Sequence, residues 1–113
     1  RSVSRGLGDV YKRQSKGVAN YSIYSAAKAG LEAITKGLAR ELAPEIKVNA
    51  IAPGAMLEPP DVTWTEEQKN KVIDSIPLKR MGSEKDIAEA VKFLANSDYI
   101  TGQIIKVDGG RSL

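Results

Sequence analysis

Apolar residues recur at spacings of three and four between Tyr24 and Leu42, which is the period of one face of an α-helix. The members of this stripe are Leu31, Ile34, Leu38 and Leu42. Pro44 follows soon after, and proline cannot continue a helix. We therefore expect an amphipathic helix over residues 24–42.

Two short apolar runs have the character of buried strands. The first, IKVNAIA, occupies residues 46–52 and is followed by Pro53-Gly54. The second, QIIKV, occupies residues 103–107 and leads into the turn signal Asp108-Gly109-Gly110. Apolar runs without polar alternation are typical of strands that are covered on both faces of a parallel sheet. The pattern thus predicts two strands, each followed by a turn that contains glycine.

Two further helices are expected between these strands. The segment from Thr65 to Gln68 matches a capping box, and an apolar side follows it before Pro77. Ser83 offers a hydroxyl cap to a second helix, whose apolar stripe is Ile87, Val91 and Leu94. Strands alternating with amphipathic helices predict an α/β fold with a doubly wound parallel sheet. A sheet of two strands is too small to be stable alone. We therefore expect the chain to supply the last two strands of such a domain, together with their helices.

Composition removes several kinds of chemistry. The chain has 113 residues, 42% of them hydrophobic and 27% charged, which is the make-up of one small globular domain. It has no cysteine and no histidine, so disulfides, zinc fingers and imidazole acid–base catalysis are excluded, and we expect no metal site. No apolar run approaches the roughly 18 residues that span a bilayer. We therefore expect a cytoplasmic protein with no membrane partner.

The basic character of the chain is confined to its first 14 residues. Residues 1–14 hold four basic side chains and one acidic side chain, which accounts for the whole formal net charge of +3. The remainder shows no basic stripe, so nucleic-acid binding is not expected. Residues 1–14 also lack periodicity and resemble translated adapter sequence. We expect residues 1–14 to be a non-native leader and residues 15–113 to be the C-terminal part of a single domain.

Tyr24 and Lys28 form the candidate acid–base pair of this chain. Their i, i+4 spacing places both on one face of the predicted helix. Phenols ordinarily titrate near pH 10, and a nearby ammonium group favours the ionised form, which makes a tyrosine usable near neutral pH. Such a pair is a weak signal alone, and an incidental surface pair is the alternative. The NAIAPG segment, residues 49–54, strengthens it, since open α/β sheets bind ligands at the carboxyl ends of their strands.

Three ordered strings give the chain a family resemblance. YSIYSAAKAGLEAITKGLARELAP, VNAIAPG and YITGQIIKVDGG resemble the C-terminal half of short-chain dehydrogenases/reductases, from about Gly17 to Leu113. The resemblance implies a Rossmann-type enzyme that uses NAD(P)H, with Tyr24 as the proton donor. It also implies that Lys28 assists the tyrosine and hydrogen-bonds the nicotinamide ribose. The residues resembling the turn that faces the nicotinamide carboxamide are Pro53, Gly54, Ala55 and Met56.

Within that family, the tyrosine doublet of YSIYSAAK and the ending ITGQIIKVDGGRSL look most like pteridine and dihydromonapterin reductases. This resemblance implies reduction of a dihydropterin with NADP(H) rather than NAD(H). Tyr21 and Trp64 are then candidates to stack on a flat substrate, although Trp64 is equally suited to pack its loop against the body. The alternatives are other short-chain reductases, such as 3-oxoacyl-[acyl carrier protein] reductases, and a non-catalytic interaction module.

Parts of the family pattern have no counterpart in this sequence. A glycine-rich phosphate loop after a first strand is absent, and no suitable third catalytic residue precedes Tyr24 at the usual distance. We therefore expect the chain by itself to be inactive, as a fragment of an active parent. The resemblance further implies that the parent is a homo-oligomer, a dimer or a tetramer.

Overall fold

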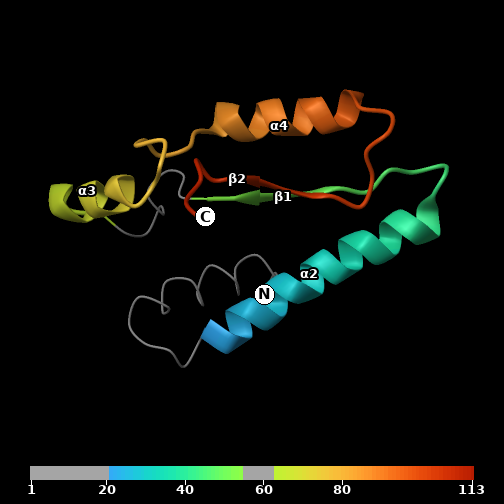
Figure 1. Cartoon of the computed structure of the whole chain (residues 1–113), viewed down its shortest axis with the longest axis horizontal. Coiled ribbons are helices and arrows are strands. Elements are labelled where there is room, and N and C mark those ends of the chain that lie inside the picture. The colour runs from blue at the N-terminus through green and yellow to red at the C-terminus, as the bar shows by residue number, and fades with distance from the viewer. Residues whose placement is uncertain (1–20, 55–62) are drawn as a thin grey trace.

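The computed structural model describes residues 21–54 and 63–113, and all five predicted elements are present in it. The chain order is α2 (Tyr21–Leu42), β1 (Ala50–Pro53), α3 (Glu66–Asp74), α4 (Glu84–Asn96) and β2 (Ile104–Val107). Figure 1 shows α4 on one side of the two strands and α2 on the other, so the described residues form three layers. This is the α/β arrangement that the hydrophobic pattern predicts.

The two strands pair in parallel. Ala50 lies opposite Ile104, and Pro53 lies opposite Val107. The backbone N–H of Gly54 donates to the Val107 carbonyl at 2.9 Å, so the pairing continues one residue beyond β1. Since both strands run in the same direction, their carboxyl ends meet at one edge of the sheet.

The first strand is shorter than the predicted range of residues 46–52, because side chains replace the regular ladder at its start. The N–H of Val48 donates to the hydroxyl of Thr101 at 3.0 Å. The side chain of Asn49 bridges the opposite segment, donating to the carbonyl of Ile100 and accepting from the N–H of Gln103, both at 3.0 Å. The apolar run therefore continues the pairing as an irregular segment, and regular strand begins at Ala50.

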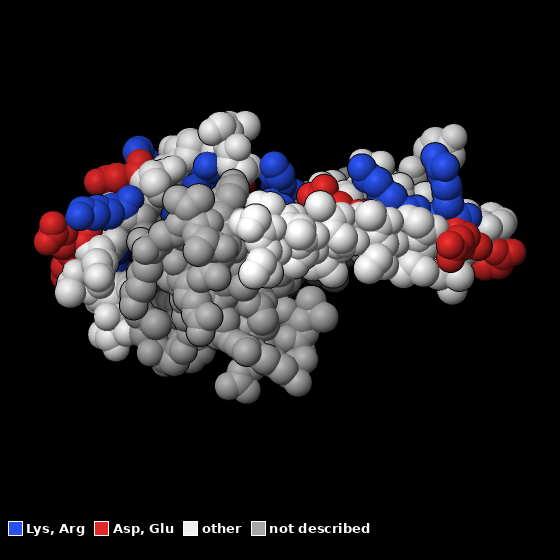
Figure 2. Space-filling model, turned by 90° about the horizontal axis from the view of Figure 1, so that it is seen from below, with Lys and Arg blue, Asp and Glu red and all other residues white. Residues whose placement is uncertain are grey.

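The buried face of α2 differs from its apolar stripe. Thr35 and Ala39 are the buried residues, with 8% and 5% of their surfaces exposed. Ala39 packs at Gly102, where an added β-carbon would lie 3.4 Å from that of Ala39. The stripe itself is 37–59% exposed. Figure 2, which views the molecule from the α2 side, shows an uncharged band along the helix with charged side chains on its flank.

Polar contacts close both ends of α4. Ser83 and Asp86 form a capping box at its N-terminus, as predicted from the hydroxyl cap, and Thr65 forms another with Gln68 on α3. At the C-terminal end of α4, the ammonium group of Lys47 donates to three backbone carbonyls, those of Leu94, Ala95 and Ser97. Positive charge at this position is favourable because the carbonyls there lack helical partners. Lys47 thus ties the segment before β1 to α4.

Replacing Lys47 with methionine is expected to lower the free energy of unfolding by about 1 kcal/mol, because the helix end loses its cation. Urea unfolding followed by circular dichroism measures this change. Lys85→Met is the matched control, since Lys85 is exposed on α4 and pairs with the exposed Glu89 at 3.9 Å. Equal losses in the two variants would contradict a capping role for Lys47.

Acid should weaken the N-terminus of α4 through Asp86. The Arg80 guanidinium, bonded to this carboxylate at 2.9 and 3.0 Å, holds the pKa of Asp86 well below its usual range, and hydrogen bonds from Ser83 contribute further. Because the pKa is lower in the folded chain, the stabilisation is present above the ordinary aspartate value of about 4 and is lost as the pH falls below it.

Asp86→Asn is therefore expected to unfold more easily than the wild type at pH 7, and the difference should shrink steadily towards pH 2. Urea unfolding midpoints at several pH values measure it. Asp98→Asn, at an exposed carboxylate after α4, serves as the control. A difference that stays constant over this pH range would contradict the assignment.

Candidate active site

Tyr24 and Lys28 lie one turn apart near the N-terminal end of α2, and both are half-buried. Continuing from Lys28 at steps of four, three and four, the same face contains Glu32, Thr35 and Ala39. Since Thr35 and Ala39 are the buried residues of α2, the tyrosine and the lysine lie on the side of the helix that contains them, here called its packed face, and Tyr24 also borders the exposed stripe at Leu31. Residues four apart on a helix have β-carbons about 5–6 Å from each other, so the two side chains start from neighbouring positions on α2.

The Pro53–Gly54 turn lies at the carboxyl end of the sheet, immediately after β1. Figure 1 shows that the N-terminal end of α2 lies towards this same end of the molecule, because α2 and β1 run in opposing directions. Ligands of open α/β sheets bind outside the carboxyl ends of the strands. The structure therefore brings the two predicted motifs to one end of the fold, whereas Ala55 and Met56 lie outside the described residues.

Gly54 is confined by steric contact with the segment after β2. A β-carbon added to Gly54 would lie 2.5 Å from the β-carbon of Asp108 and 2.6 Å from its α-carbon, so no larger residue fits. The Gly54 N–H is also committed to the Val107 carbonyl. A ligand at this turn must therefore bind to other backbone groups, and Pro53 supplies no N–H.

The two predicted substrate contacts are placed differently. Tyr21 is the first residue of α2, but its side chain lies outside the described residues. Trp64 is half-buried and directly precedes Thr65, the N-cap of α3. Its contact with a substrate stays a prediction, as does that of Tyr21.

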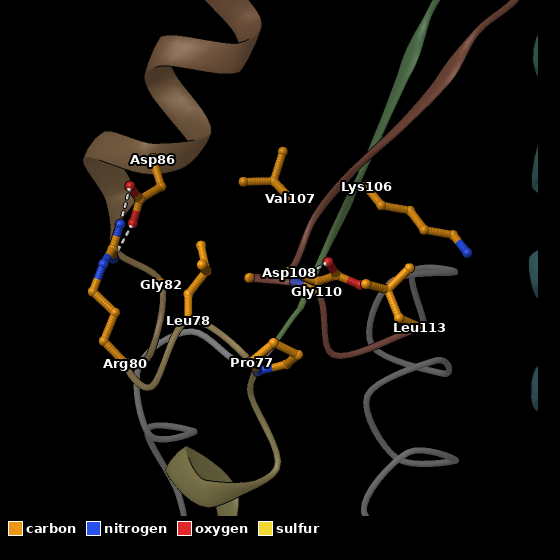
Figure 3. A pocket seen from close by; sticks show the side chains of 11 residues that line it. Pro77, Leu78, Arg80, Gly82, Asp86, Lys106, Val107, Asp108, Gly110 and Leu113 are labelled. Carbon is orange, nitrogen blue, oxygen red and sulfur yellow. Dashed lines mark hydrogen bonds and ion pairs between the residues drawn. The ribbon is translucent and has the colours of Figure 1, made fainter.

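A cavity of about 460 Å³ lies between the segments 77–82 and 106–113, and none of the predicted site residues lines it. Figure 3 shows Arg80 directed at Asp86, and Asp108 directed at its own turn. The oxygens of Asp108 accept from the N–H groups of Gly110 and Ser112 at 2.9 and 3.1 Å. The carboxylates of both aspartates that line the cavity, Asp86 and Asp108, are thus engaged in structural contacts. Sequence reasoning did not find this cavity, because its walls come from segments far apart in the chain.

Within the described ranges 21–54 and 63–113, no cluster of acidic side chains could hold a metal ion. The same ranges contain no helix that is long and apolar enough to cross a membrane.

Comparisons with known proteins agree on the family. A family model described as enoyl-(acyl carrier protein) reductase matches residues 10–112. Carbonyl reductase family member 4 of Danio rerio is 46% identical over 99 residues, covering 87% of this chain and 40% of the relative. A 3-oxoacyl-[acyl-carrier-protein] reductase of Staphylococcus epidermidis is 47% identical over 90 residues, covering 77% of this chain and 37% of the relative. The chain thus spans about two fifths of the length of these relatives.

Solved structures show the same fold. A small-chain dehydrogenase in complex with NADPH matches with a TM-score of 0.72 and 39% identity, covering 83% of this chain and 44% of that one. A short-chain dehydrogenase from Leptospira borgpetersenii with bound NAD+ matches with a TM-score of 0.70 and 37% identity, covering 80% of this chain and 35% of that one. These neighbours confirm the predicted Rossmann-like fold.

The finer resemblance to pteridine reductases receives no support, since the relatives named above are reductases of carbonyl and 3-oxoacyl compounds. The broader resemblance is confirmed by the family model, by the relatives and by the solved structures together. The chain belongs to the short-chain dehydrogenase/reductase family.

Proposed function

We propose that this chain carries the proton-donating half of a nicotinamide-dependent oxidoreductase site. The observation that supports the proposal is the position of Tyr24 and Lys28 on the packed face of α2, at the end of the fold where Pro53–Gly54 follows β1. Tyr24 would hold the proton that the substrate oxygen receives during reduction. Lys28 would keep its positive charge beside the phenol and favour the phenolate left after the transfer.

The residues present fit the nicotinamide end of a dinucleotide. Lys28 offers an ammonium group that can donate to ribose hydroxyls, and the turn at Pro53 and Gly54 offers backbone carbonyls to a carboxamide. When bound, the reduced dinucleotide supplies the hydride. We propose NADP(H) as the partner, following the motif resemblance. The solved neighbours include one complex with NADPH and one with NAD+, so titration with both dinucleotides tests the preference.

A ketone is the proposed substrate class. Relatives named for carbonyl and 3-oxoacyl reduction support this choice, because a carbonyl oxygen needs one proton and one hydride. A dihydropterin is the second candidate and rests on the tyrosine doublet of YSIYSAAK. Assays of the protein as its gene encodes it, with an acetoacetyl thioester and with 7,8-dihydrobiopterin, separate the two. Turnover of neither compound, together with absent dinucleotide binding, would favour a non-catalytic interaction module.

Tyr24→Phe is expected to lower kcat by about 10²–10⁴-fold, because the ring stays in place while its transferable proton is lost. Dinucleotide affinity, measured by dihydronicotinamide fluorescence, should stay near the wild-type value. Tyr99→Phe is the matched control, since Tyr99 is fully exposed and follows the C-terminal end of α4. Undiminished kcat in Tyr24→Phe would rule out the proposed role.

Lys28→Met is expected to weaken dinucleotide binding and to lower kcat together, since the ammonium group is proposed to serve both ribose and phenol. The same fluorescence titration and steady-state assay measure the two effects. Lys36→Met, eight residues further along α2 at an exposed position, supplies the control. A variant that lowers neither quantity would remove Lys28 from the site.

A further inference from the structure

The turn after β2 is closed by the side chain of Asp108. Its Oδ1 accepts from the N–H of Gly110 at 2.9 Å, and its Oδ2 accepts from the N–H of Ser112 at 3.1 Å. Gly109 and Gly110 have φ angles of +62° and +88°, which favour glycine. Hydrogen bonds from Ser112 and from Gly110 also lower the pKa of Asp108, so the carboxylate is ionised at neutral pH. One charged side chain thus sets the shape of this turn.

The turn at residues 108–112 packs directly against Gly54. The β-carbon position of Gly54 lies only 2.5 Å from that of Asp108, and the Gly54 N–H is bonded to the neighbouring Val107 carbonyl at 2.9 Å. The hydrogen bond to Val107 and the close contact with Asp108 therefore both hold Gly54 against the end of β2. The backbone position of Asp108 decides where the Pro53–Gly54 turn lies.

The turn at residues 108–112 also contacts the segment from Ile76 to Leu78. The N–H of Leu78 donates to the Gly109 carbonyl at 3.1 Å. A β-carbon added to Gly109 would lie 2.7 Å from Cγ2 of Ile76, which is 1% exposed and is the most completely buried large side chain of the described residues. Figure 3 shows Asp108 and Gly110 beside Pro77 and Leu78. The turn is thus held between Gly54 on one side and Ile76 to Leu78 on the other.

We propose that Asp108 is a positioning residue for the nicotinamide end of the dinucleotide site. It acts through the Pro53–Gly54 turn and makes no contact with the reacting atoms itself. This inference rests on the proposed function, because it assigns the turn to a nicotinamide ligand. Without the carboxylate, the 108–112 turn loses two hydrogen bonds, and the backbone that packs against Gly54 is no longer held in place.

The test compares two ligands in the protein as its gene encodes it. The first is NADPH or NADH, whichever the wild type binds more tightly, and the second is its counterpart without nicotinamide, 2′-phospho-ADP-ribose or ADP-ribose. Asp108→Ala is expected to weaken binding of the dinucleotide by about tenfold, the equivalent of 1.4 kcal/mol, and to leave the truncated ligand unchanged. Asp108→Asn keeps the acceptor for Gly110 and should lose about threefold. Asp98→Ala, at an exposed carboxylate, should match the wild type.

The outcomes separate this inference from the proposed function. Equal losses for both ligands in Asp108→Ala would show a role in stability alone and overturn the inference, as would unchanged binding. If Asp108→Ala does not fold, Asp108→Asn decides, and the absence of a ligand-selective loss there overturns it. A wild type that gains no affinity from the nicotinamide group and catalyses no hydride transfer would instead overturn the proposed function.

Discussion

The parallel pairing of β1 with β2 is the constraint on which the rest of this structure depends. It joins segments about fifty residues apart in the chain, and it ends where the Gly54 N–H meets the Val107 carbonyl. The intervening α4 covers both strands, and its C-terminal end is tied back to the segment before β1 by Lys47. Because this pairing places Asp108 directly beside Gly54, the architecture of the sheet and the shape of the candidate site are set by the same contact.

Local signals in the sequence predict the helices well. The hydroxyl caps at Thr65 and Ser83 act on residues three positions away, so their effect is visible within a few letters. The start of β1 could not be predicted in this way, because it depends on Thr101, half the chain away, replacing a ladder partner. Which face of α2 is buried also depends on residues far away in the sequence. A small residue, Ala39, is needed there because the backbone at Gly102 approaches closely, whereas the larger apolar residues stay exposed.

The candidate site also has a part that local sequence predicts and a part that depends on distant residues. Tyr24 and Lys28 could be singled out from the sequence, because one helical turn relates them whatever surrounds the helix and because the NAIAPG segment and the family resemblance accompany them. The requirement for glycine at position 54 is not explained by its neighbours in sequence, because the residue that excludes a side chain is Asp108. The contact of Gly54 with Asp108, and the cavity between segments 77–82 and 106–113, therefore depend on residues that are far apart in the sequence.

The packing of α2 connects the stability of the fold to the geometry of the site. An α-helix behaves as a stiff rod over a few turns, so the contact of Ala39 with Gly102 helps to fix the direction in which Tyr24 and Lys28 are presented. Gly102 has a φ angle of +74°, so a side chain there would strain the backbone, and its β-carbon would be in van der Waals contact with Ala39. Ala39 thus bears on the candidate site from about four turns away, because its small side chain lets α2 lie close to the segment that leads into β2.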